Sequence, residues 1–171
     1  MKNLVFTIVF LSTIGIYSQA VFDASRNGDL DKIKELYKID KDVVNAVDSK
    51  GFTPLILATY HDKPKVVAFL LENGSNVNAK DLSGNTALMG VCFKGNLKMA
   101  KMLINKKATI DQKNYNNATA LIYASTFGHT EIVEYLLSNK ADKAIADNRG
   151  NTALKHATMQ GNADIIELLS K

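Results

Sequence analysis

The chain has 171 residues, the length of one ordinary domain. Its 21 Lys and Arg residues exceed its 17 Asp and Glu residues, so the formal net charge is +4 and the sequence pI is about 9.0. Acidic residues are interleaved with the lysines in every part of the chain, which argues against binding to a phosphate backbone. The single cysteine, Cys92, excludes an internal disulfide.

The first twenty residues follow the pattern of a signal peptide. Lys2 gives a positive start, Leu4 to Ile16 form a mostly apolar run, and Ser18-Gln19-Ala20 places small residues where a signal peptidase reads. The apolar run is shorter than the ~20 residues of a membrane span. We expect cleavage after Ala20 and a mature protein that is periplasmic or secreted and not attached to a membrane. An uncleaved anchor and an ordinary N-terminal helix are the alternatives.

The sequence pattern of residues 21–47 predicts a pair of short helices. Asn27-Gly28-Asp29 separates the two helices, since these residues favour a turn. An apolar stripe marks the face that packs, and its members are Phe22, Ala24, Ile33, Leu36 and Tyr37. The segment lacks the motif that follows it, so we interpret it as an N-terminal cap.

From residue 51 onwards, one short motif returns every 33 residues. Its copies are Gly51-Phe52-Thr53-Pro54-Leu55, Gly84-Asn85-Thr86-Ala87-Leu88, Asn117-Ala118-Thr119-Ala120-Leu121 and Gly150-Asn151-Thr152-Ala153-Leu154. A fixed period of this length indicates a supersecondary unit that is stacked several times. In the first copy, Thr53 can cap a helix that begins at Pro54.

On these motifs the chain resembles the ankyrin-repeat family, whose unit is a β-turn followed by two antiparallel helices. Gly128-His129 before Glu131-Ile132-Val133, and Gly74-Ser75-Asn76-Val77-Asn78-Ala79 before Asp81, extend the resemblance. It implies an all-α ankyrin-repeat solenoid of five helix pairs joined by β-turn or hairpin loops. The domain spans 21–171, with repeats at about 21–47, 48–80, 81–113, 114–146 and 147–171. The third repeat departs from the pattern, because Gly90 lies inside its first helix and Lys107 replaces a glycine.

Catalytic and metal-binding patterns are missing from the sequence. The histidines at 61, 129 and 156 have no Cys or carboxylate beside them at a metal-binding spacing. We expect His156 to pack in a first helix, and the resemblance implies a structural hydrogen bond for His129. Cys92 lies where the repeat needs a small buried residue. The sequence therefore predicts no enzymatic activity and no cofactor.

The family resemblance implies a concave binding face made of the hairpin tips and the ends of the first helices. Clustered exposed apolar groups, aromatic ones above all, are typical of a binding surface. We therefore predict a monomer that binds a protein partner of unknown identity, rather than nucleic acid, through Phe52, Tyr60, His61, Leu82, Phe93, Lys94, Tyr115, Phe127, Arg149 and Met159.

Three alternatives remain open at this point. Tyr60 and Phe93 can instead fold over the next repeat and belong to the core. The lysines of the third repeat can bind nucleic acid or another anionic partner, and these are Lys94, Lys98, Lys101, Lys106 and Lys107. A small ligand or a metal ion can bind at His61 and the neighbouring hairpin tips.

Overall fold

A computed structural model describes residues 19–171, so the predicted signal peptide over 1–20 lies outside the described residues except for its last two positions. The helices pair as expected, and the prediction of an all-α repeat fold is confirmed for the described part of the chain. Contacts divide the chain into two compact units. The first unit ends at Asn76 and the second comprises Val77–Lys171.

The first unit contains two helix pairs and one additional short helix. Residues 19–27 are helical and are followed by α2 (Leu30–Ile39), η1 (Lys41–Asn45), α3 (Pro54–Tyr60) and α4 (Pro64–Glu72). The sequence did not predict the 3₁₀ helix η1. The Asp40 side chain accepts a hydrogen bond from the Asp42 amide, and Val43 and Val44 are buried, so this turn is held at its start and by its apolar face.

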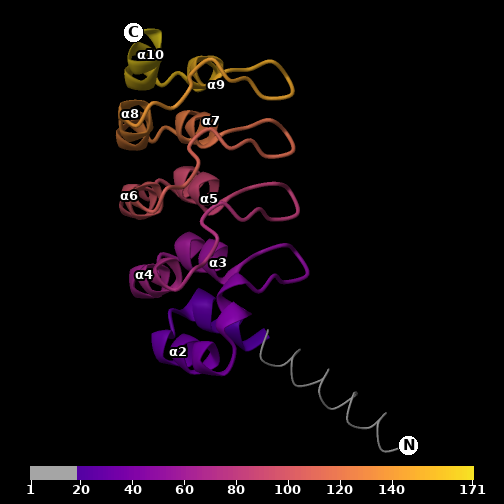
Figure 1. Cartoon of the computed structure of the whole chain (residues 1–171). Coiled ribbons are helices and arrows are strands. Elements are labelled where there is room, and N and C mark those ends of the chain that lie inside the picture. The colour runs from indigo at the N-terminus through magenta and orange to yellow at the C-terminus, as the bar shows by residue number, and fades with distance from the viewer. Residues whose placement is uncertain (1–18) are drawn as a thin grey trace, which may run out of the picture. The chain divides into compact units, whose positions relative to one another are not determined.

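The second unit contains three helix pairs. They are α5 (Ala87–Lys94) with α6 (Leu97–Asn105), α7 (Ala120–Thr126) with α8 (Thr130–Ser138), and α9 (Ala153–Gln160) with α10 (Ala163–Ser170). The first helices α5, α7 and α9 stack in that order, and α6, α8 and α10 stack beside them (Figure 1). In this unit, the hairpin loop before each first helix projects to the same side (Figure 1).

A threonine begins each of the four repeated first helices, as the motif predicts. The hydroxyl oxygens of Thr53, Thr86, Thr119 and Thr152 accept a hydrogen bond from the amide three residues later, at 3.2 to 3.4 Å. Each bond satisfies one of the four amides that have no partner inside the helix. The 33-residue period of the sequence is therefore also a period of helix starts.

An aspartate or asparagine shapes each hairpin loop in the same way. The positions are 48, 81, 114 and 147, and one side-chain oxygen accepts from the amides two and four residues later at 2.8 to 2.9 Å. The loop residue three positions on has a positive φ, and it is glycine in three copies and Asn117 in the other. These loops therefore keep their conformation whichever side chains stand at their tips.

Neighbouring hairpin loops of the second unit are joined by backbone hydrogen bonds. The Tyr115 amide donates to the Ser83 carbonyl at 3.1 Å, and the Asn148 amide donates to the Asn116 carbonyl at 2.9 Å. The Asn117 side chain also donates to the Asn148 side chain at 2.6 Å. These bonds set the spacing of the loop tips, so side chains on successive tips are held at a fixed separation.

The core of each repeat consists of aliphatic side chains from both helices, and Cys92 lies within it. This thiol is fully buried, and its burial raises the pKa of Cys92 far above the ordinary value. The thiolate is the reactive form of cysteine, so the folded protein keeps this group inert. The interpretation of Cys92 as a packed core residue is confirmed.

Among residues 19–171, no helix combines the length and the apolar character that a membrane crossing requires.

Candidate protein-binding surface

Nine of the ten predicted contact residues are exposed. Phe52 is the exception, because its ring is half-buried at the first hairpin loop. Phe52, Tyr60 and His61 belong to the first unit, where the rings of Tyr60 and His61 meet edge to face at 5.6 Å. The second unit carries the other seven, which are Leu82, Phe93, Lys94, Tyr115, Phe127, Arg149 and Met159. Of these seven, Phe93 and Phe127 are in direct contact, and Phe127 and Arg149 line one pocket.

Phe93 and Phe127 form an aromatic pair between two repeats. Phe93 lies in the last turn of α5 and Phe127 is the C-cap residue of α7. Their ring centroids are 4.5 Å apart with an angle of 71° between the planes, yet Phe93 remains 38% exposed and Phe127 47% exposed. Phe93 thus contacts the next repeat, as one alternative proposed, and still presents its ring to solvent. An edge-to-face pair of this kind adds about 0.5–1.5 kcal/mol beyond area burial.

His129 holds the backbone under this aromatic pair. Its Nε2 lies 3.1 Å from the carbonyl oxygen of Phe93, and because a carbonyl only accepts, Nε2 carries the donated proton. The family-implied structural hydrogen bond of His129 is therefore confirmed. It ties the end of α5 to the start of α8 and fixes the position from which the Phe93 ring projects.

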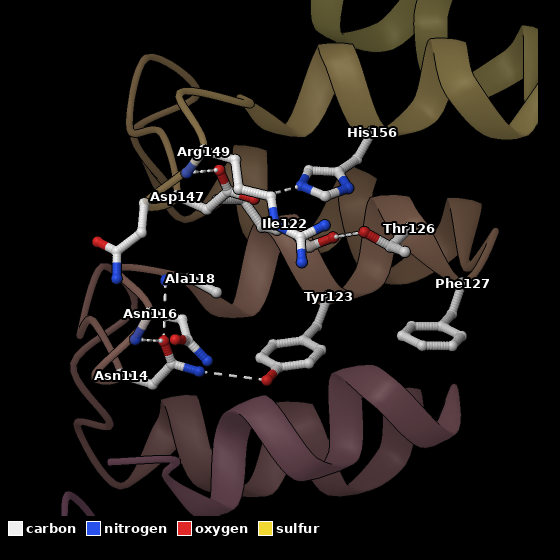
Figure 2. A pocket seen from close by; sticks show the side chains of 11 residues that line it. Asn114, Asn116, Ala118, Ile122, Tyr123, Thr126, Phe127, Asp147, Arg149 and His156 are labelled. Carbon is white, nitrogen blue, oxygen red and sulfur yellow. Dashed lines mark hydrogen bonds and ion pairs between the residues drawn. The ribbon is translucent and has the colours of Figure 1, made fainter. Parts of the chain in front are cut away.

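A pocket of about 290 Å³ lies beside Phe127, between the hairpin loops and the helices α7 and α9 (Figure 2). Its walls contain apolar groups, amides and four charged or titratable side chains. The lining residues are Asn114, Asn116, Ala118, Ile122, Tyr123, Thr126, Phe127, Asp147, Asn148, Arg149 and His156. Only Phe127 and Arg149 were predicted as contact residues from the sequence.

One side of the pocket is fixed by a network of three side chains. The Asn114 amide donates to Asn85 at 2.8 Å and to the Tyr123 hydroxyl at 3.2 Å, and that hydroxyl donates to Asn85 at 3.2 Å. Burial and the carboxylate of Asp81 raise the pKa of Tyr123, and the hydrogen bond from Asn114 offsets only part of this rise. The phenol therefore stays neutral, and its ring is held in place as a wall of the pocket.

The opposite side carries an Asp147–His156 pair (Figure 2). His156 Nε2 donates to Asp147 Oδ2 at 2.8 Å, while Oδ1 accepts from the amides of Arg149 and Asn151 at 2.9 Å. Partial burial raises the pKa of Asp147, but the bonds from Asn151, His156 and Arg149 together outweigh it, so the net effect lowers the pKa. Asp147 is an ionised carboxylate with both oxygens engaged.

The lowered pKa of Asp147 makes the stability of the folded protein depend on pH. The folded-state pKa is lower than the unfolded value of about 3.9, so the stabilisation is present above that value and is lost as the pH falls through the folded pKa. Asparagine at this site keeps the turn, as Asn114 does, but loses the charge. We expect Asp147→Asn to destabilise the protein at pH 7 and the difference from wild type to shrink by pH 3.

Urea unfolding at several pH values, followed by circular dichroism, measures this difference. Glu134→Gln is the control, because this substitution also removes one negative charge but does so at a side chain that is exposed on α8. A difference between wild type and Asp147→Asn that is the same at pH 7 and pH 3 would contradict the assignment.

Arg149 is the charged pocket residue without a bound partner. Its guanidinium takes part in none of the hydrogen bonds or ion pairs found among residues 19–171, although its backbone amide closes the hairpin turn. In Figure 2 the side chain runs from its loop towards the space between His156 and the rings of Tyr123 and Phe127. It is an exposed cation at the edge of the pocket.

Groups that could hold a metal ion are absent from the described part of the chain, where no three His, Cys, Asp or Glu side chains come together. The pocket also brings no nucleophile next to its histidine, since His156 is directed at Asp147. The arrangement is suited to binding.

Comparison with known proteins decides the family. The family model described as ankyrin repeats matches three overlapping stretches, residues 21–114, 79–147 and 109–171. The chain belongs to the ankyrin-repeat family. Ankyrin repeats are in general protein-interaction modules without enzymatic activity.

Curated relatives match this ankyrin-repeat protein over part of its length. The human "DNA-binding protein RFXANK" is 37% identical over 59 residues, which is 34% of this chain and 23% of the relative. The "BTB/POZ domain-containing protein 3" of Schizosaccharomyces pombe (strain 972 / ATCC 24843) is 42% identical over 53 residues, which is 31% of this chain and 10% of the relative. The matches thus cover less than a quarter of either relative.

Sequence reasoning missed Tyr123 and His156 as surface residues of this ankyrin-repeat protein. Both stand nine residues after the Asp or Asn of their loop, at the position that Leu57 and Gly90 occupy in the preceding repeats. The leucine at this position of the second repeat led to the expectation that His156 packs in a first helix, and Leu57 is indeed buried. His156 is instead half-buried, with its ring engaged by Asp147 on the pocket side. The shared offset from the loop residue was the available signal.

Proposed function

We propose that this ankyrin-repeat protein binds another protein through the inner surface of its second unit. We define the inner surface as the hairpin loops and first helices at residues 80–95, 113–128 and 146–161. The observation that carries the proposal is the Phe93–Phe127 pair, two large rings that are fixed against each other and still exposed. Aromatic anchors supply a large share of interface energy, and an exposed cluster of them usually marks an interaction site.

The fixed geometry of the inner surface supports the same function. Backbone hydrogen bonds join the loops, His129 holds the end of α5, and the Asn114 network holds Tyr123. Ordering a flexible side chain on binding costs about 0.5–1.5 kcal/mol. These side chains are already ordered, so a partner meets a preformed surface and little of its binding energy is spent on immobilising them.

We further propose that the protein is exported, periplasmic or secreted, and that it scaffolds, stabilises or inhibits an exported partner. The signal-like pattern of residues 1–20 supports export. Cleavage after Ala20 retains Val21 and Phe22, which are 0% and 2% exposed in the core. The thiol of Cys92 is buried, so an oxidising compartment does not threaten the fold. The N-terminal residue of the purified mature protein, found by mass spectrometry, tests this proposal, and an N-terminus upstream of Val21 contradicts it.

Affinity capture with the chain that begins at Val21 tests the binding function. We expect Phe93→Ser combined with Phe127→Ser to abolish retention of the partner, while the helical circular dichroism spectrum remains nearly that of wild type. Ile39→Ser combined with Val47→Ser is the matched control, since both side chains are 60% exposed and lie in the other unit. A partner that is retained equally by both double variants would show that the aromatic pair is not its anchor.

Binding to an anionic partner through the third repeat is the second candidate. Its five lysines, Lys94, Lys98, Lys101, Lys106 and Lys107, are all exposed between the end of α5 and the loop after α6. Binding to a polyanion weakens steeply with salt, whereas an aromatic interface weakens little. Partner retention should therefore be measured between 50 and 300 mM NaCl, about a sixfold range of ionic strength. A steep loss over this range indicates polyanion binding, and a small loss indicates the aromatic interface.

A further inference from the structure

The net positive charge of the chain lies in the second unit. Residues 77–171 contain eleven lysines and one arginine against eight Asp and Glu residues, whereas residues 1–76 contain nine cationic and nine acidic residues. The full formal charge of +4 therefore belongs to the unit that carries the aromatic pair and the pocket. A surface of one sign attracts a partner of the other sign and raises the association rate.

The inner surface has the same imbalance, and its carboxylates are engaged. It carries five cations, Lys80, Lys94, Lys113, Arg149 and Lys155, and two carboxylates, Asp81 and Asp147. Asp81 accepts from the amides of Ser83 and Asn85 and from the Asn85 side chain. Asp147 accepts from two amides and from His156. Both acidic groups thus hold hairpin turns, while the Arg149 guanidinium has donors to offer.

The pocket next to Arg149 is large enough to take a protein side chain. Its volume of about 290 Å³ is at the lower limit of the ~300–1,000 Å³ that small-molecule sites occupy. The rings of Tyr123 and Phe127 give it an apolar wall, and Arg149 gives it a planar cation with several N–H donors (Figure 2). A guanidinium pairs with a carboxylate through two parallel hydrogen bonds, which is the geometry that a lone Arg at a pocket edge can provide.

We propose that this pocket takes the carboxylate side chain of an acidic segment of the partner protein. The Asp or Glu pairs with Arg149, and an apolar or aromatic neighbour in the same segment packs on Phe93 and Phe127. This inference rests on the proposed function and names the chemistry of the partner. It makes Arg149 the specificity residue of the inner surface and the aromatic pair its anchor.

An acidic peptide fits the charges of the pocket better than a nucleic acid does. A nucleic acid needs several phosphates neutralised together, and the pocket offers a single arginine. The ionised Asp147 lies in the same wall and repels dense negative charge, whereas one carboxylate can be placed at Arg149 with its stem against the rings. The observations therefore favour a monoanionic side chain flanked by apolar groups.

Selection of peptides from a random 12-residue display library on the immobilised chain from Val21 onwards tests the proposal. We expect the selected sequences to be enriched in Asp or Glu next to an aromatic or aliphatic residue. A synthetic peptide of the most frequent sequence should bind Arg149→Gln at least about tenfold more weakly than wild type, the loss typical of removing a charge-assisted hydrogen bond. Lys65→Gln, which removes the same charge from an exposed position of α4 in the other unit, should bind as wild type does.

Several outcomes overturn the proposal. Selected peptides without acidic enrichment, an empty selection, equal binding by Arg149→Gln and wild type, or an equal loss in Lys65→Gln each contradict it. So does tighter binding of a 12-nucleotide single-stranded oligonucleotide than of the selected peptide at 150 mM NaCl. A partner whose capture depends on Phe93 and Phe127 but not on Arg149 leaves the proposed function intact and removes only this inference.

Discussion

Replacing Leu121 by alanine is expected to lower the free energy of unfolding by about 2–5 kcal/mol. Leu121 is 1% exposed in α7, which packs against α5, α8 and α9 in the middle of the second unit. Loss of the side chain removes its burial and leaves a cavity among groups that other helices hold in place. In a stacked fold each repeat is supported by its neighbours, so this defect weakens the contacts on both sides.

Urea unfolding of the purified chain, followed by far-ultraviolet circular dichroism, measures the effect. Leu82→Ala is the matched control, because it removes the same atoms from a side chain that is 70% exposed at a hairpin tip. We expect the control to change the free energy by less than about 0.5 kcal/mol. Equal losses in the two variants would mean that α7 does not occupy the core position described above.

Replacing Gly84 by alanine is expected to destabilise the second unit more than the same change at Gly150. Both glycines have a positive φ, of 80° and 76°, so each variant carries the strain of about 1–2 kcal/mol for a side chain in this region. Only at Gly84 does the new Cβ meet backbone, 2.8 Å from the Tyr115 amide nitrogen. At Gly150 nothing lies within 4 Å. Relieving the overlap at Gly84 costs about another 1–3 kcal/mol.

The Gly84→Ala overlap also affects a hydrogen bond between loops. Tyr115 donates its amide to the Ser83 carbonyl, next to the new methyl group, so we expect faster hydrogen exchange at the Tyr115 amide. Exchange at the Asn148 amide, which bonds to Asn116, should remain unchanged in this variant. Equal destabilisation by Gly84→Ala and Gly150→Ala would indicate that the two loops are not held at the observed spacing.

The helices were predictable because local chemistry and the period agree. Each repeat begins with a threonine cap and carries apolar residues at helical spacing, and the contacts that stabilise it come from neighbouring copies of the same pattern. The 3₁₀ helix η1 was missed because it depends on one side-chain hydrogen bond, to Asp40, and on the burial of Val43 and Val44, which the repeated motif does not specify. A segment this short shows no hydrophobic period, so the sequence pattern does not predict a helix there.

The binding surface was predictable only in part. The repeat indicated which residues stand at loop tips and helix ends, and the exposure of Phe93 and Phe127 follows from those positions. Their mutual contact, and the pocket beside Phe127, depend on side-chain directions across two repeats, which spacing does not specify. The role of His156 likewise depends on Asp147 lying within reach of its ring, a distance that the sequence does not contain. The partner-binding role of all ten residues stays a prediction.

In the hairpin loops of the second unit, one residue determines the backbone conformation and the residue after it has an exposed side chain. Asp81, Asn114 and Asp147 determine the conformation of their loops, whereas the next residues along the chain, Leu82, Tyr115 and Asn148, have exposed side chains. Leu82 can therefore be exchanged without altering how its loop is built, whereas the Asn148 side chain also bonds to Asn117 and to the Tyr115 carbonyl and helps to join two loops. Under the proposed function, substitutions at such exposed tip positions change the partner with little cost to folding, and these positions are the natural place to engineer a new one.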